Sequence, residues 1–569
     1  MTQIVHRIVP EEFHNTLLEA GLSPLMARLL ASRNVTHVDQ LNASLANLLP
    51  PHTLTCNEAM ARLLADAIAG HKKILVVGDY DADGATATAV AVKGLRAFGA
   101  NVDFLVPNRF EYGYGLTPEI VALAASRDPD VIVTVDNGIA SVDGVAAANL
   151  RGIQVLITDH HLPGPEKPEA ACIINPNQTG CEFASKHLAG VGVIFYGLLC
   201  LRAELRQRGV YAQKPEPNLT ELLDLVALGT VADLVKLDDN NRILVEQGLR
   251  RIRAGVCSPG ILALLRVSGR PHQSVNAQDL GFYVGPRLNA AGRLDDMSIG
   301  IRCLLADSDA VATPLAQQLH DLNLQRRGIE ADMQDSANYS LEALDVQNQF
   351  TVSLYEQDWH QGVIGILASR IKERFHRPVI VFADAGDGLI KGSGRSIASL
   401  HLRDALDLVS KYQPDLLLKF GGHAMAAGLT IRQTDFTRFR DSFEQVVKSL
   451  ITEADLESML EVDGSLPYED FSFHTAKALE AQVWGQGFTP PLFFDAFEVL
   501  NQRVVGEKHL KLSLKLINES LNANAAVIDA IYFNQAAFIA ERIQAVYQLQ
   551  TNEYNGTQRV QLNLRHVVT

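Results

Sequence analysis

Residues 74–90, ILVVGDYDADGATATAV, place three carboxylates on alternate positions, at Asp79, Asp81 and Asp83. An apolar run precedes these acids and a glycine follows them. Negative charges held this close raise each other's pKa unless a cation lies between them. The crowding therefore points to metal chemistry, and carboxylates mixed with imidazoles suit Mn²⁺ or Mg²⁺.

Further acids and two histidines follow other apolar runs. They are Asp136 in VTVDNGI, Asp159, His160 and His161 in ITDHH, and Asp233 in ALGTVADL. If the runs are parallel strands, ligands bind outside their carboxyl ends, where these side chains would gather. Two divalent ions about 3.5–4 Å apart, bridged by one carboxylate, are the arrangement used for phosphoryl displacement. We therefore expect a two-metal site at this edge of the sheet.

Each motif has another interpretation when it is taken alone. A single acid after a strand, such as Asp136, is usually a helix cap or a turn residue. The triplet Asp159-His160-His161 is also compatible with a turn that holds one satisfied core histidine. The joint occurrence of these motifs at predicted strand ends favours the metal site.

The elements that must position these side chains alternate along the chain. Short apolar stretches predict strands at 73–79, 101–108, 130–138, 153–161 and 171–177. Helical spacing predicts helices between them, at 84–100, 117–128 and 141–152. This alternation predicts an α/β fold with a parallel sheet covered on both faces.

The rest of the chain predicts a second α/β unit and a barrel. A long connecting helix is expected at 307–345, with one face buried through Val311, Leu315, Leu319, Leu322, Ile329 and Met333. A smaller α/β unit begins at about residue 350. Five short β segments fit a C-terminal OB-like β-barrel, at 497–506, 509–516, 525–533, 542–550 and 559–567.

Composition limits the class of protein. The chain has 569 residues, of which 47% are hydrophobic and 20% charged, so global disorder is excluded. The formal net charge of −15 argues weakly against a nucleic-acid partner, because a local basic channel can exist on an acidic protein. The longest apolar stretch, 189–201, is too short to span a bilayer, so we expect a soluble cytoplasmic protein without a membrane partner.

The motifs GDYDADG, VDNG, TDHH and ALGTVAD, in this order, resemble the DHH phosphoesterase superfamily. Five further motifs, VPNRFEYGYGL, GPRLNAAGR, WHQGVIGILASR, GSGRS and FGGHAMAAG, resemble its RecJ family of single-strand-specific DNA exonucleases. The resemblance covers nearly the whole chain. It implies a helical lead-in at 1–50, a DHH catalytic domain at 51–255, a helical connector at 256–345, a DHH-associated domain at 346–450 and an OB-fold domain at 451–569.

The resemblance also implies roles for individual residues. The metal ligands would be Asp79, Asp81, Asp83, Asp136, His160 and Asp233, although Asp79 could instead accept a hydrogen bond beside the ligands. Asp136 would be the bridging ligand, and His161 would contact the scissile phosphate or orient the attacking water. Substrate-binding residues would be Arg109, Arg287, Asn289, Ser393, Arg395, Gly422 and His423. On sequence alone, GSGRS could equally be a mobile hairpin turn, and GGHAMAAG could be the closely packed N-terminus of a helix.

The activity implied by the resemblance is removal of 5′-mononucleotides from single-stranded DNA, in the 5′ to 3′ direction, with two Mn²⁺ or Mg²⁺ ions. The implied setting is DNA recombination and repair, with single-strand-binding protein and a RecQ-type helicase as partners.

Three alternatives remain at this point. One is a DHH-family phosphodiesterase or phosphatase that acts on short oligonucleotides or small phosphate substrates. The second is a non-catalytic DNA-binding scaffold, which should lack some of the ligands. The third is a nucleotide-binding module, since Gly78 and Gly84 flank a strand–helix turn, although the spacing is not GxGxxG and no P-loop lysine follows.

Overall fold

A computed structural model describes residues 2–342, 346–517, 527–554 and 557–568. The chain forms two compact units, and each is described by itself. The larger unit comprises residues 6–292, 296–320 and 461–569. The smaller unit comprises residues 321–460 with the short segments 2–5 and 293–295.

The larger unit contains the predicted parallel sheet, in the order β3–β2–β4–β5–β6. Its strands are β2 (Lys73–Gly78), β3 (Asn101–Leu105), β4 (Val131–Val135), β5 (Gln154–Thr158) and β6 (Cys172–Ile174). All five predicted strands are confirmed. Gly78 pairs with Val135, and Val135 pairs with Thr158, so the three central strands end level with one another.

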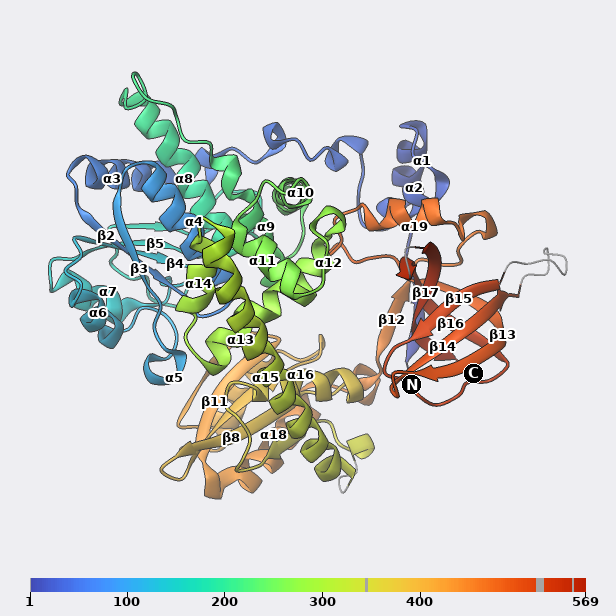
Figure 1. Ribbon diagram of the computed structural model, residues 1–569. Helices are drawn as coiled ribbons and strands as arrows, with labels where there is room; N and C mark the ends of the chain where they lie inside the picture. The colour runs from blue at the N-terminus through green and yellow to red at the C-terminus, as the bar shows by residue number, and fades with distance from the viewer. Residues whose placement is uncertain (1, 343–345, 518–526, 555–556, 569) are drawn as a thin grey trace. The chain divides into compact units, whose positions relative to one another are not determined.

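Helices cover both faces of this sheet (Figure 1). One face carries α3 (Asn57–Ala69), α4 (Ala82–Ala97) and α8 (Gly190–Gln207), and the other carries α6 (Pro118–Ala125) and α7 (Val142–Asn149). A further helix, α9 (Leu223–Ala232), packs on α4 and α8. The strands are buried on both sides, which explains why they read as continuous apolar runs in the sequence.

The chain contains several further helices in its described part. The first two of them in the chain lie within the segment predicted as a helical lead-in, 1–50. These further helices are α1 (Glu11–Glu19), α2 (Pro24–Ala31), α5 (Arg109–Tyr112), α10 (Asp239–Arg253), α11 (Pro259–Val267), α12 (Ala277–Asp279), α13 (Gly285–Leu294) and α14 (Ser298–Leu305). None of the described helices is long and apolar enough to cross a bilayer.

The predicted long helix is α15 (Asp309–Glu342), and residues 343–345 of that prediction lie outside the described part of the chain. Leu319 and Met333 are buried as expected. The prediction was wrong for Val311, whose side chain is 53% exposed. The small side chain of Ala312 occupies the packed side of that turn instead.

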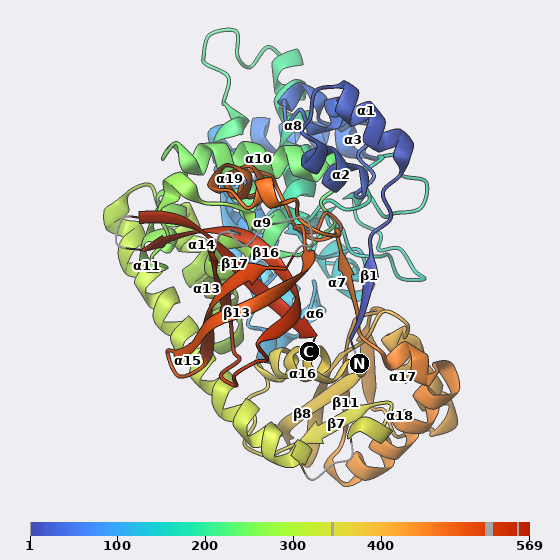
Figure 2. The same cartoon turned by 90° about the vertical axis from the view of Figure 1, so that its right-hand side faces the viewer.

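The smaller unit has a mixed sheet in the order β10–β11–β9–β8–β7, in which only β7 and β8 run parallel. Figure 2 shows this sheet with α17 and α18 beside it. The strands are β7 (Val352–Tyr355), β8 (Val379–Gly386), β9 (Leu389–Arg395), β10 (Lys419–Gly422) and β11 (Ala426–Arg432). The helices are α16 (Ile364–Phe375), α17 (Leu402–Tyr412) and α18 (Phe436–Leu450).

The glycine-rich motifs of this unit are strands. The first four residues of GSGRS lie in β9 and FGG lies in β10, so the hairpin-turn and helix-N-terminus interpretations were wrong. Packing explains the glycine at 392, because a Cβ there would lie 2.6 Å from the ring of Phe382. A glycine in a strand can therefore signal close packing rather than a turn.

The C-terminal strands form the predicted five-stranded closed barrel, in the order β13–β14–β15–β17–β16. They are β13 (Phe493–Val505), β14 (His509–Leu516), β15 (Val527–Tyr532), β16 (Arg542–Tyr554) and β17 (Thr557–Val568). The barrel core includes Phe493, Phe497 and Tyr547, and it extends to α2 and to α19 (Phe473–Glu480). The sequence did not predict the small pair of β1 (Gln3–His6) with β12 (Met459–Val462).

Candidate metal centre

The acidic groups gather at the carboxyl ends of the level strands β2, β4 and β5. Asp79, Asp136 and Asp159 are the first residues after these strands. Asp81 is the N-cap of α4, where its Oδ1 accepts a hydrogen bond from the Gly84 N–H at 2.9 Å. Asp83 lies in the first turn of the same helix. The strand-to-helix turn therefore supplies three carboxylates to one edge of the sheet.

Three overlapping groups of side chains have ligand atoms within 4.8 Å of one another. They are Asp79–Asp81–Asp136, Asp83–His160–Asp233 and Asp136–His160–His161. The Nε2 atom of His160 lies 3.2 Å from Asp136 Oδ1 and 3.6 Å from Asp233 Oδ2. The structure therefore brings together all six predicted metal ligands and His161.

Asp136, like His160, belongs to two of these groups. Its backbone has a positive φ of 62°, a conformation that Asp tolerates better than most residues, and its N–H donates to the Thr158 carbonyl at 3.0 Å. The side chain is 2% exposed, and Oδ1 accepts no hydrogen bond from the residues that the structure describes. It does not cap a helix, since α7 begins only at Val142. A buried carboxylate oxygen of this kind is what a divalent cation would satisfy.

Charge crowding changes the protonation of the acids. Burial, followed by repulsion from Asp81, raises the pKa of Asp83 to about 7. Burial and the charge of Asp83 also raise the pKa values of Asp136 and Asp233 well above the ordinary range. Protons and metal ions therefore compete for this site, and a bound cation would favour the ionised carboxylates.

The N-terminus of α8 fixes the orientation of Asp83. The carboxylate accepts hydrogen bonds from the Gly190 N–H at 2.6 Å and from the Val191 N–H at 3.0 Å. Only glycine fits at 190, because a Cβ there would lie 2.5 Å from the Cβ of Asp136. The backbone at the N-terminus of α8 therefore packs directly against Asp83 and Asp136 and holds them in position.

Asp159 is a supporting residue that the sequence did not identify by role. Its Oδ1 accepts hydrogen bonds from the N–H groups of His160 and His161 at 2.7 and 3.1 Å, and lies 2.8 Å from Nδ1 of His161. Its Oδ2 accepts from the Ile139 N–H at 2.9 Å. Burial acts to raise the pKa of Asp159, but the hydrogen bonds lower it, so the group stays ionised. Asp159 holds both histidines in place.

Tyr114 also escaped the sequence analysis. Its hydroxyl lies 3.1 Å from Nδ1 and 3.2 Å from Nε2 of His161, and 3.4 Å from the Asp136 carbonyl. Gly113 and Gly115 on either side have positive φ angles, so the YGYG segment turns sharply around the tyrosine. These two glycines were the only feature of the sequence that could have pointed to Tyr114.

The predicted substrate-binding residues of the larger unit have structural partners. Asn289 accepts a hydrogen bond from the Ala82 N–H at 2.8 Å, between the metal-site acids Asp81 and Asp83. Arg287 is 8% exposed and contacts His320, with its Nη2 3.0 Å from Nδ1. The side chain of Arg109 lies outside the described part of the structure.

The predicted phosphate-binding residues of the smaller unit lie at one end of its sheet. Arg395 pairs with Ala426, and Gly422 pairs with Ala427, so one strand separates Arg395 from Gly422 and His423. Arg395 Nη1 donates to Ser393 Oγ at 3.3 Å. Gly422 has a φ of 145°, and a Cβ there would lie 2.4 Å from the Ala426 carbonyl oxygen. The hairpin geometry therefore requires a glycine at this position.

Three family models match separate parts of the chain. The DHH family N-terminal domain matches residues 73–230, the DHHA1 domain matches residues 347–449, and the RecJ OB domain matches residues 462–566. The five-part division at residues 50, 255, 345 and 450 stays a prediction.

Close relatives match over the full length. The single-stranded-DNA-specific exonuclease RecJ of Dickeya dadantii is 49% identical, over 100% of this chain and 99% of the relative. The protein of the same name from Salmonella typhimurium is 50% identical, over 96% of each chain. The crystal structure of RecJ with Mn²⁺ from Thermus thermophilus is 29% identical, with a TM-score of 0.83 over 100% of this chain and 79% of that one.

These matches and the site define the class as a DHH-superfamily metal-dependent nuclease fold. The chain belongs to the RecJ family of single-stranded-DNA-specific exonucleases. Solved RecJ structures from Thermus thermophilus contain Mn²⁺ or Mg²⁺. The carboxylate and imidazole groups at the sheet edge suit the same ions.

Proposed function

We propose that this protein is a metal-dependent exonuclease that degrades single-stranded DNA from its 5′ end and releases 5′-mononucleotides. The observation that carries the proposal is the gathering of six predicted ligands and His161 at one sheet edge. Identities of 48–50% to exonucleases of this specificity, over nearly the whole chain, supply the substrate class.

The six ligands would hold a pair of divalent ions. Asp136 and His160 each belong to two of the three groups, and Asp136 would be the shared ligand because a carboxylate has two oxygens that can bind two ions. Such ions stabilise charge on a phosphoryl oxygen and lower the pKa of water, so that a nucleophile exists at neutral pH. The protein contributes the fixed spacing of the carboxylates, which the level strand ends and the turn before α4 impose.

His161 would bind the scissile phosphate. Its Nδ1 lies 2.8 Å from the ionised Asp159, which places a proton on that nitrogen. Burial acts to lower the pKa of His161, but the hydrogen bond and charge of Asp159 raise it above its ordinary value. The protonated ring carries a second N–H at Nε2, and this group can donate to a phosphate oxygen.

Binding of the DNA backbone would fall to the smaller unit and the barrel. The Arg395 guanidinium suits a bidentate phosphate contact, and the glycine at 422 lets backbone amides approach a phosphate. The five-stranded barrel supports binding of the nucleotides that follow, since OB folds combine stacking surfaces with a groove for the backbone.

The cellular setting follows from the family resemblance. We propose a cytoplasmic protein that acts in DNA recombination and repair. Single-strand-binding protein and a RecQ-type helicase are the proposed partners, because they would expose and present the single strand.

A timed digest tests the proposed function. Single-stranded DNA labelled at the 5′ or the 3′ end is incubated with Mn²⁺, and a duplex and an RNA strand serve as controls. We expect immediate release of the 5′ label as a mononucleotide and stepwise shortening of the 3′-labelled strand. Activity confined to dinucleotides or small phosphate esters would instead support the alternative phosphodiesterase, which has no use for the barrel.

A further inference from the structure

A polar pocket of about 460 Å³ lies at the opposite end of α4 and α9 from the metal centre. It is lined by Lys93 near the end of α4 and by Asp224 in the first turn of α9, whereas the metal ligands Asp83 and Asp233 stand at the other ends of these helices. Lys93 is nearly three turns from Asp83, about 15 Å along the helix at about 1.5 Å per residue. The pocket is therefore separate from the metal centre.

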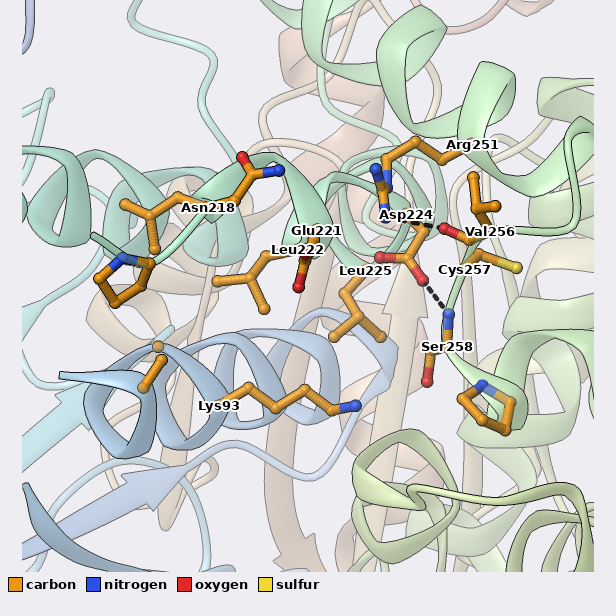
Figure 3. A pocket seen from close by; sticks show the side chains of 15 residues that line it. Lys93, Asn218, Glu221, Leu222, Asp224, Leu225, Arg251, Val256, Cys257 and Ser258 are labelled. Atoms are coloured by element: carbon orange, nitrogen blue, oxygen red, sulfur yellow. Dashed lines mark hydrogen bonds between the residues drawn. The ribbon is translucent and has the colours of Figure 1, made fainter. Parts of the chain in front are cut away.

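The pocket combines charged groups with an apolar wall (Figure 3). Lys93 and Arg251 supply positive charge, and Glu221 and Asp224 supply carboxylates. Leu222, Leu225, Val256 and two prolines form the apolar wall. A volume of this size is in the range of small-molecule sites, which are commonly about 300–1,000 Å³.

Asp224 is fully buried, yet it is only half satisfied. Its Oδ2 accepts a hydrogen bond from the Ser258 N–H at 2.6 Å, as Figure 3 shows. Its Oδ1 is buried and accepts no hydrogen bond from the described residues. A buried acceptor without a donor is unfavourable, so a donor from a bound molecule that reaches Oδ1 would be stabilising.

The two cations also have unused donors. Arg251 donates through Nη2 to the Val256 carbonyl at 2.8 Å, but its buried Nε has no acceptor in the described structure. Lys93 makes no ion pair with any described residue. Burial raises the pKa of Asp224, and the charge of Lys93 acts in the opposite direction. Both side chains are therefore available to an anion.

We propose that this pocket binds a nucleoside 5′-monophosphate. The phosphate would lie between Lys93 and Arg251, a base N–H would donate to Asp224 Oδ1, and the base would pack against the apolar wall. We choose a nucleoside 5′-monophosphate among small anions because the proposed exonuclease releases this product. This choice therefore rests on the proposed function. The pocket would then sense the product of the reaction.

Isothermal titration calorimetry of the full-length, metal-free protein with 5′-dGMP tests this proposal. Lys93→Met and Arg251→Met remove the charges of half-buried side chains while keeping their length. Arg96→Met is the matched control, because Arg96 is exposed on α4 and does not line the pocket. His161→Ala reports any binding at the metal centre, and thermal melting confirms that each variant is folded.

We expect one bound nucleotide in the unmodified protein, in Arg96→Met and in His161→Ala. Lys93→Met and Arg251→Met should each weaken binding by about tenfold or more, as expected for a lost hydrogen bond to a charged group. No binding, equal binding of inorganic phosphate alone, or unchanged affinity in both pocket variants would overturn the proposal. Calorimetry needs no catalysis, so a failed digest would leave this result interpretable.

Discussion

The edge of the parallel sheet and the end of the mixed sheet differ in how closely their charged side chains are placed. At the parallel edge, buried acids crowd together and several of their pKa values rise, which is unfavourable unless a cation binds. At the end of the mixed sheet, Arg395 and Gly422 lie one strand apart without such crowding. We propose that the crowded acids carry the chemistry and that Arg395, beside close-packed glycines, binds the substrate.

This contrast sets the expected size of each mutation's effect. Substitutions at the parallel edge should reduce kcat, because they remove groups that act on the reacting phosphate. Substitutions at the end of the mixed sheet should mainly raise KM, because they remove contacts made before and during the reaction alike.

The largest effect is expected for Asp136→Ala. Loss of the carboxylate shared by two ligand groups should reduce kcat by about a thousandfold or more. Asp143→Ala is the control, since Asp143 is exposed on α7 and should retain full activity. Initial rates on 5′-labelled single-stranded DNA give the comparison. If Asp136→Ala retained the wild-type rate, Asp136 would not be a ligand of the catalytic metal ions.

Asp159→Asn should have the next largest effect. The amide keeps the shape of Asp159 but weakens its hold on His161, so kcat should fall by about 10–100-fold, as for other residues that orient ligands. The pH–rate profile is the decisive readout, because loss of the carboxylate should lower the pKa of His161. An unshifted profile with a reduced rate would assign Asp159 a purely structural role.

Arg395→Ala tests the mixed sheet. We expect KM for a 5′-phosphorylated strand to rise by about tenfold, with a smaller change in kcat. Lys391→Ala is a matched control, because Lys391 is exposed on the same strand and the same face, four residues earlier. If both substitutions raised KM equally, Arg395 would contribute only its positive charge and not a specific phosphate contact.

The smallest effect concerns stability in the absence of metal. The pKa of Asp83 rises from 3.8 to about 7 in the folded protein, so the folded state binds the extra proton and loses stability as pH rises across this interval. Metal-free protein should therefore melt several degrees lower at pH 8 than at pH 5. Saturating Mn²⁺ should stabilise the protein more at pH 8, and scanning fluorimetry with and without chelator measures both differences.

The fold was predictable where apolar runs end in turn residues. The strands of the parallel sheet carry such runs, whereas barrel strands such as β14 were recognisable from alternating apolar and polar residues. The strands β10 and β11 were missed because GGHAMAAG is rich in small residues, which have little strand preference. Pairing of β10 with β11, and of β11 with β9, makes these segments strands, rather than local preference.

The candidate site was predictable in its ligands but not in its supports. Acids that directly follow apolar strands revealed the ligand set, and family resemblance assigned the individual roles. Asn289 was expected near substrate, yet its observed partner is the Ala82 N–H, a contact across 207 residues of sequence. The roles of Asp159 and Tyr114 likewise depend on distances that only the folded chain defines.

Anomalous diffraction from crystals grown with Mn²⁺ is the most direct test of the central claim. The account predicts two manganese peaks at the parallel-sheet edge, with Asp136 coordinated to both and His160 coordinated to one. No manganese within coordination distance of Asp136, or ions held only by surface acids elsewhere, would contradict it.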